Sequence, residues 1–269
     1  MTFAARSPLP VWIVSALVLL FLVLPIFIVV PISFSSATYL QFPPAHYSLR
    51  WYDVYFGTQG WFAATLLSAK IAVVVMILAT ALGTAAAFAL VRAQFPGKSL
   101  LYGFLLSPLI VPTIITAIAV YFLFAKLHLI GNWLGLVLAH TVLAIPLVVV
   151  VVSASLSGFN VMLERAAMSL GAAPWQALRR VTLPIIAPGI VTAALLAFLA
   201  SFDEVVIAIF IAGSGAVTLP KKMWDGLWLE ITPAIAAAST FVIAVTIILF
   251  VAMELLRRRS ERVTLKRSA

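Results

Sequence analysis

The sequence contains no cysteine, and only 9% of its 269 residues are charged. The absence of cysteine excludes a disulfide framework and any metal site built on thiolates. The scarcity of charge excludes an ordinary soluble globular domain, in which about a quarter of the residues are charged. Apolar residues make up 64% of the chain, and the mean hydropathy is +1.20. The composition therefore indicates an integral membrane protein.

Six apolar runs are each long enough to cross a hydrocarbon core of about 30 Å at a helical rise of about 1.5 Å per residue. They predict membrane-spanning helices at 10–33, 61–90, 101–124, 133–155, 187–212 and 234–256. We therefore expect an all-α polytopic protein. Its expected parts are a first helix with an outer segment (1–57), a five-helix core (58–256) and a basic tail (257–269).

The 17 Lys and Arg residues outnumber the 8 Asp and Glu residues and are unevenly placed. If the N-terminus is cytoplasmic, the inner side holds Arg6, Arg92, Lys98, Arg165, Arg179, Arg180, Arg257, Arg258, Arg259, Arg262, Lys266 and Arg267. The outer side then holds only Arg50, Lys126, Lys221 and Lys222. This asymmetry predicts that both termini are cytoplasmic. The basic tail is expected beside anionic lipid headgroups, so the positive charge does not indicate a nucleic-acid partner.

Two aromatic groups are expected at the outer membrane interface, where amphipathic rings settle. The first consists of Trp51, Tyr52, Tyr55, Phe56 and Trp61. The second consists of Trp224 and Trp228, which a short helix would place on one face, with Asp225 between them. For this second group, contact with substrate or with a binding protein is the alternative to interface anchoring.

The sequence offers no catalytic constellation. Gly97-Lys98-Ser99 resembles the end of a nucleotide-binding loop, but Arg92 stands where that loop requires glycine. The three histidines lack the spacing of a metal-binding helix, and His140 is interpreted as a hydrogen-bonding residue between packed helices. We therefore expect neither enzymatic activity nor a bound metal or cofactor.

A polar and basic segment, residues 163–189, separates the fourth and fifth predicted spans. Its start is rich in helix formers, and Gly171 is placed to end that helix. Pro174 suits the first turn of a second short helix, which Pro184 is expected to end. A compact helix-turn-helix at the cytoplasmic surface is therefore predicted within a loop over 157–186. It is either held against lipid headgroups by its arginines or approached closely by another protein.

The same segment resembles the EAA loop of inner-membrane permease subunits of binding-protein-dependent ABC importers. That family's pattern is Glu-Ala-Ala-x3-Gly-x9-Ile-x-Leu-Pro, and this chain matches its spacing from Gly171 to Pro184. Arg165 stands at the position of the pattern's Glu, directly after Glu164. The resemblance implies a coupling helix over 164–171 that docks into an ATPase subunit. The implied coupling residues are Glu164, Arg165, Ala166, Ala167, Gly171, Leu183 and Pro184.

A second stretch is similar to permeases of the spermidine/putrescine group. It comprises residues 201–207, Phe210-x-x-Gly213 and Thr218-Leu219-Pro220. The resemblance implies a bacterial inner-membrane protein that forms half of a pathway for a polyamine-like or other small organic solute. The implied partners are a second permease, two ATPase subunits that bind ATP and Mg²⁺, and a periplasmic binding protein.

Asp203 and Glu204 form a candidate site independently of any family, because acids inside a span are costly unless they face a partner or water. Lys70 lies at the same predicted depth, about 14 Å from the outer face at helical rise. We predict that Lys70 pairs with one acid and that the other makes the pathway electronegative, with Phe202 beside it. A self-compensated triad that only locks helices together is one alternative. A proton- or ion-coupled secondary transporter that titrates both acids is another.

Overall fold

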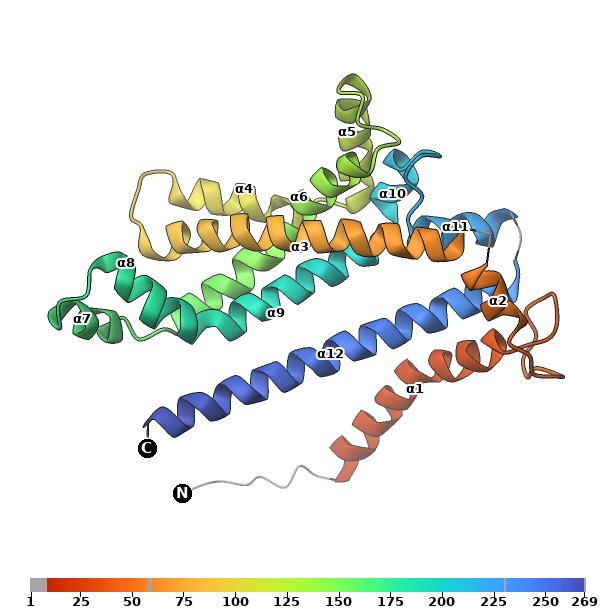
Figure 1. The fold of residues 1–269 in the computed structure, drawn as a ribbon, viewed down its shortest axis with the longest axis horizontal. Helices are drawn as coiled ribbons and strands as arrows, with labels where there is room; N and C mark the ends of the chain where they lie inside the picture. Colours follow the sequence, from red (N-terminus) through yellow and green to blue (C-terminus); the bar gives the residue numbers. More distant parts are fainter. Residues whose placement is uncertain (1–8, 58–59, 230, 269) are drawn as a thin grey trace. The chain divides into compact units, whose positions relative to one another are not determined.

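The computed structural model describes residues 9–57, 60–229 and 231–268. The chain divides into two compact units. The first comprises residues 1–62 and 225–244, and the second comprises residues 63–224 and 245–269. The regular structure of both units is helical throughout the described ranges, which confirms the predicted all-α class (Figure 1).

Among the residues that the structure describes, five helical stretches are long and apolar enough to cross a membrane. They are α1 (Leu9–Ser33), α3 (Trp61–Arg92), α6 (Trp133–Ser157), the run Pro174–Phe202 that ends in α9 (Leu183–Phe202), and α12 (Pro233–Ser268). A sixth span is present if α4 (Lys98–Ile110) and α5 (Thr113–Lys126) count as one bent helix. The side on which the termini lie stays a prediction.

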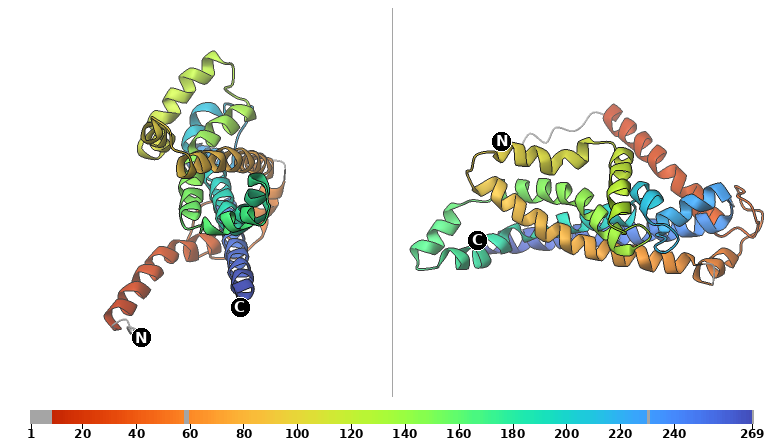
Figure 2. Two further views of the ribbon diagram at one scale, coloured as in Figure 1. Left: turned by 90° about the vertical axis from the view of Figure 1, so that its left-hand side faces the viewer. Right: turned by 90° about the horizontal axis from the view of Figure 1, so that it is seen from above.

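The predicted third span, 101–124, is wrong as a single helix. It is broken between α4 and α5, whose axes differ by 103°, and α5 points away from α4 in both Figure 1 and Figure 2. Pro112 causes the break, because its ring disfavours helical backbone at the preceding residue. Val111 is accordingly extended, with φ −72° and ψ 131°. Each piece is about 20 Å long, too short to cross the hydrocarbon core alone.

The predicted fifth span, 187–212, is wrong at both ends. Its helix begins earlier, with α8 (Pro174–Ala177), and passes through the π-helical turn η1 (Leu178–Thr182) into α9. Pro184 does not end it, because the Leu183 N–H bonds to the Leu178 carbonyl five residues back and this wider turn accommodates the proline ring. At the other end α9 stops at Phe202, and α10 (Val206–Ile211) starts after a three-residue break.

The core of the second unit lies where α6 packs along α9 (Figure 1). Val148 and Val152 of α6 and Ala193 and Ala197 of α9 are fully buried. The small residues on α9 let the two backbones approach closely, as is common between membrane helices. This crossing fixes the positions of the residues at both ends of α9.

Gly189 marks the tightest approach between α6 and α9. A Cβ at this position would lie 1.9 Å from Ser155 Oγ and 2.8 Å from Ser155 Cβ. We expect Gly189→Ala to destabilise the protein by about 1–3 kcal/mol, because the added methyl group overpacks a filled interface. Thermal unfolding in detergent would measure this change. The control is Gly103→Ala in α4, where nothing lies within 4 Å of the added carbon; equal melting temperatures for the two variants would contradict the expectation.

The first unit buries three of the aromatic residues that were expected at the outer interface. Trp51 and Tyr55, on α2 (Arg50–Phe56), and Trp61 are at most 6% exposed. Trp51 Nε1 donates a hydrogen bond to the Ala37 carbonyl at 3.0 Å, and the Tyr55 ring lies 5.4 Å from that of Phe241. These three rings therefore pack within the protein instead of facing lipid headgroups, and their depth in the membrane stays a prediction.

Candidate translocation and coupling sites

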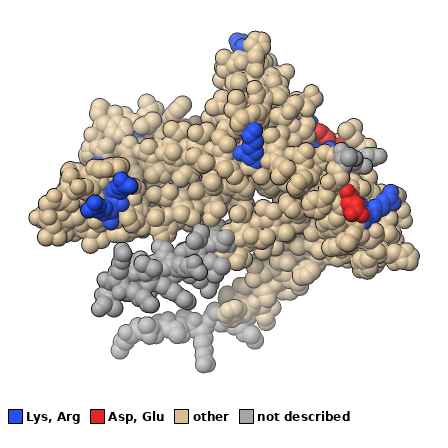
Figure 3. Space-filling view, in the orientation of Figure 1, with Lys and Arg blue, Asp and Glu red and all other residues tan. Residues whose placement is uncertain are grey.

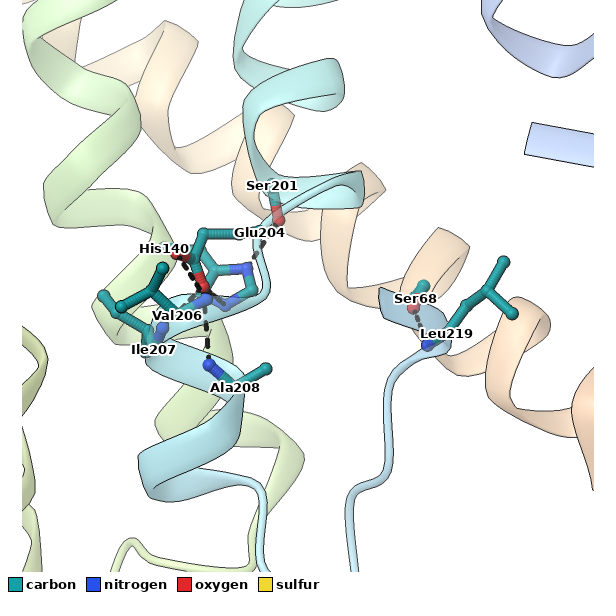
Figure 4. Close-up of polar contacts among 8 residues, drawn as sticks. All are labelled: Ser68, His140, Ser201, Glu204, Val206, Ile207, Ala208 and Leu219. Atoms are coloured by element: carbon teal, nitrogen blue, oxygen red, sulfur yellow. Dashed lines mark hydrogen bonds and ion pairs between the residues drawn. The ribbon is translucent and has the colours of Figure 1, made fainter. Parts of the chain in front are cut away.

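The break between α9 and α10 is built around the carboxylate of Glu204. It accepts hydrogen bonds from the backbone N–H groups of Val206, Ile207 and Ala208, at 3.1, 2.8 and 3.4 Å (Figure 4). The first N–H groups of any helix lack partners within the helix, and in an apolar surrounding they need an acceptor. Glu204 therefore caps α10 and holds the break in place.

His140 ties the break to the neighbouring helix α6. Its side chain is buried, its Nδ1 lies 2.9 Å from Ser201 Oγ at the end of α9, and its Nε2 lies 3.7 Å from Glu204 Oε2 (Figure 4). The contact with Ser201 joins two packed helices, as the sequence predicted for His140. It also explains how α9 can end inside the apolar region without a proline.

Asp203 differs from its neighbour in being exposed. Its backbone N–H closes the last turn of α9 on the Leu199 carbonyl at 3.1 Å. Within the described ranges, no side-chain hydrogen bond or ion pair engages its carboxylate. The C-terminal end of a helix carries partial negative charge, so the Asp203 carboxylate adds to an already electronegative position. The two adjacent acids thus have different surroundings: one is bound to backbone and the other is accessible.

The predicted ion pair of Lys70 with one of these acids is wrong in this structure. Lys70 Nζ lies 3.9 Å from the centre of the Trp133 ring, and no ion pair to Asp203 or Glu204 occurs in the described part of the chain. An equal depth in the membrane does not fix the direction in which a helical side chain points. Phe202 is buried and stacks on Phe198 with a centroid distance of 5.6 Å, so its ring packs against its own helix.

The predicted helix-turn-helix is confirmed in its local structure. α7 (Met162–Ser169) is followed by Gly171 with φ +92°, and α8 begins at Pro174. The positive φ is one that glycine adopts at no steric cost, which is why the turn falls there. The Gln176 side chain accepts a hydrogen bond from the Ala173 N–H at 3.1 Å and caps the second helix.

Glu164 points into the protein from this hairpin and is only 8% exposed. Arg92, the last residue of α3, donates to Oε2 of Glu164, and the buried Thr182 hydroxyl donates to Oε1. The Arg92 guanidinium also lies 5.4 Å from the centre of the Phe159 ring. One carboxylate thus joins the end of α3, α7 and η1. Sequence reasoning missed Arg92 and Thr182, since they lie 72 and 18 residues away from Glu164.

The other predicted coupling residues lie on α7, in the turn after it and at the start of α9. Arg165, Ala166, Gly171 and Pro184 are exposed, whereas Ala167 and Leu183 are half-buried. The pattern's acidic position is thus occupied by an exposed arginine, and the nearby acid is turned inward.

The predicted outer helix is present as α11 (Leu219–Leu229). The Leu219 N–H at its start donates to Ser68 Oγ of α3 at 2.8 Å (Figure 4). Trp224 and Trp228 are 40% and 74% exposed, and Asp225 is half-buried. Their exposure is compatible with either function considered for this helix.

Long apolar helices, an acid at a helix break and a helical hairpin between two candidate spans are typical of a polytopic membrane transport protein. Residues 79–264 match the family described as "binding-protein-dependent transport system inner membrane component", and the chain belongs to this family. The family assignment confirms the resemblance found in residues 165–184. It also confirms the predicted location as a multi-pass protein of the inner membrane.

The chain is similar to permeases named for polyamines. It is 36% identical to the putrescine transport system permease protein PotI of Escherichia coli K12, over 96% of this chain and 94% of the relative. It is 32% identical to the spermidine/putrescine permease protein PotC of Haemophilus influenzae, over 89% and 93%. A chain of a bacterial ABC transporter that imports alginate matches with a TM-score of 0.68 at 18% identity, over 94% of this chain and 99% of that one. This last likeness shows that the fold is shared.

Proposed function

We propose that this chain is a permease subunit of an ATP-driven importer and forms half of the translocation pathway for a small organic cation of the polyamine class. The observation that carries the proposal is the accessible Asp203 carboxylate at the end of α9. A carboxylate at the negative end of a helix is suited to an ammonium group. The names of the two polyamine permeases support the same class of solute.

The working assembly contains a second, related permease, two copies of an ATPase and a periplasmic binding protein. ATP and Mg²⁺ bind to the ATPase subunits, and this chain supplies pathway wall and coupling surface. Closure of the ATPase pair on ATP moves the α7–α8 hairpin, which closes the inner side of the pathway and opens the outer side. The continuous helix from Pro174 to Phe202 connects that hairpin with the break at Asp203.

The alternative is a secondary transporter that titrates Asp203 and Glu204 together. The geometry disfavours it, because Glu204 is engaged by three backbone N–H groups and so has a structural role of its own. Family membership also favours the ATP-driven reading. The two mechanisms differ in the energy source: uptake should stop when the ATPase is inactivated and should survive a protonophore while ATP is maintained.

Asp203→Asn tests the cation site. Uptake of radiolabelled putrescine should fall about tenfold or more, because a charge-assisted contact worth about 1.5–3 kcal/mol is lost. The same change at Asp53, an exposed acid in the first turn of α2, should leave uptake unchanged. Both variants must first be shown to assemble with the ATPase. Normal uptake by an assembled Asp203→Asn transporter would contradict the proposed role of Asp203.

A further inference from the structure

The exposed face of the α7–α8 hairpin is basic. Arg165 on α7 and Arg179 and Arg180 on η1 are all exposed. Glu164 is the only acid between residues 161 and 202, and its carboxylate is turned inward onto Arg92 and Thr182. In the view of Figure 3 the basic side chains over α7 and α8 have no acidic side chain beside them. Any partner that binds this face therefore meets positive charge.

The same face also has the features of a protein-binding surface. A hollow lies between Trp175, Gln176, Arg179 and Arg180, so two guanidinium groups and an indole ring border one depression. Leu170, at the end of α7, is 90% exposed. Guanidinium groups form paired hydrogen bonds with carboxylates, and an apolar residue beside them supplies contact area. The surface fits acidic side chains presented from a partly apolar groove.

The length of α3 allows the hairpin to reach the edge of the membrane. The 32 residues of α3 extend about 48 Å at helical rise, which exceeds the roughly 40–45 Å of a whole bilayer with its headgroups. Arg92 ends this helix and is bound to Glu164 of the hairpin. A hairpin held at that end of α3 lies at or beyond the headgroup layer, where another protein can reach it.

We infer that the ATPase groove that receives this hairpin presents acidic side chains opposite Arg165, Arg179 and Arg180. This inference rests on the proposed function, which supplies the ATPase as the partner. It adds the prediction that the ATPase side of the contact is negatively charged. The EAA pattern has an acid where this chain has Arg165. Because Glu164 is already bound within the chain, it does not replace that acid at the surface. At this position the chain therefore presents a positive charge to the ATPase where the pattern presents a negative one.

Charge removal and charge reversal at Arg165 test the inference on the complete transporter. We expect Arg165→Gln to weaken retention of the ATPase moderately and Arg165→Glu to weaken it about tenfold or more, because reversal adds like-charge repulsion. The difference between the two variants should shrink as NaCl is raised, since salt screens exposed charges. Arg50→Glu, which reverses an exposed arginine on α2, should retain the ATPase normally. Equal or tighter retention by Arg165→Glu would overturn the inference.

Arg165→Lys allows the partner carboxylate to be identified by chemical cross-linking. The introduced amine keeps the positive charge. A carbodiimide would join this amine by an amide bond to a carboxylate in direct contact with it. The water lost from the two groups converts the carbodiimide to a urea. A cross-link mapped by mass spectrometry to an Asp or Glu of the ATPase supports the inference. Retained ATPase without such a cross-link, or retention that depends only on anionic lipid in the vesicles, overturns it. If the wild-type chain retains no ATPase at all, the proposed function itself fails.

Discussion

The Glu204→Ala protein is expected to unfold at a much lower temperature than the wild type and to accumulate poorly in membranes. The substitution removes the acceptor of three backbone N–H groups at the start of α10. In an apolar surrounding each unsatisfied backbone group costs up to several kcal/mol. The change also removes the oxygen that lies 3.7 Å from His140 Nε2. Membrane levels and thermal unfolding in detergent would measure the loss.

Two variants separate this structural role from transport. Glu204→Gln keeps one acceptor oxygen and should be intermediate in stability. Asp203→Asn removes the neighbouring charge without touching the cap and should unfold close to the wild-type temperature. If Glu204→Ala instead unfolds at the wild-type temperature, the hydrogen bonds of Glu204 do not hold the break, and its role must be sought in the pathway.

Glu164→Gln is expected to destabilise the hairpin and to uncouple transport from ATP hydrolysis. The carboxylate joins α3, α7 and η1, and its loss leaves the Arg92 guanidinium partly buried without its counter-charge. Breaking a buried pair costs about 3–5 kcal/mol, and because the Arg92 side chain is 29% exposed we expect the low end, about 3 kcal/mol. Thermal unfolding and the ratio of solute imported to ATP hydrolysed would both report the change.

A double-mutant cycle isolates this contact. Arg92→Gln, Glu164→Gln and the double variant should show a coupling energy of about 1–3 kcal/mol, because removing either partner already breaks the pair. Thr182→Val removes only the hydroxyl on the other oxygen and should cost about 1 kcal/mol. Additive effects of Arg92 and Glu164 would show that the ion pair contributes nothing to stability.

Local signals in the sequence predicted the helices that are regular from end to end. The first and fourth predicted spans, 10–33 and 133–155, agree with α1 and α6 to within a few residues. The hairpin was predictable for the same reason, since Gly171 and Pro174 act on their immediate neighbours. The match of residues 165–184 to a known spacing then led to the correct family.

The two breaks were not predictable, and for different reasons. Pro112 breaks a helix, whereas Pro25 and Pro146 lie within continuous helices. The presence of a proline therefore does not by itself predict where a helix breaks. The break after Phe202 has no proline: Glu204 caps α10 locally, and Ser201 at the end of α9 is bound to His140, which lies 61 residues away in the chain. Contacts between residues distant in the sequence also explain two other failures of prediction. Lys70 lies over the Trp133 ring, and Glu164 binds Arg92 and Thr182.

The helix from Pro174 to Phe202 runs without a break from the hairpin to Asp203. Its 29 residues extend about 44 Å at helical rise. A tilt of about 10° would displace one end by about 8 Å relative to the other, without any hydrogen bond in the helix being broken. A small rotation of the helix at the hairpin would thus move the Asp203 end sideways by several ångströms. In the proposed transporter, a tilt of this one element would carry motion from the hairpin to Asp203.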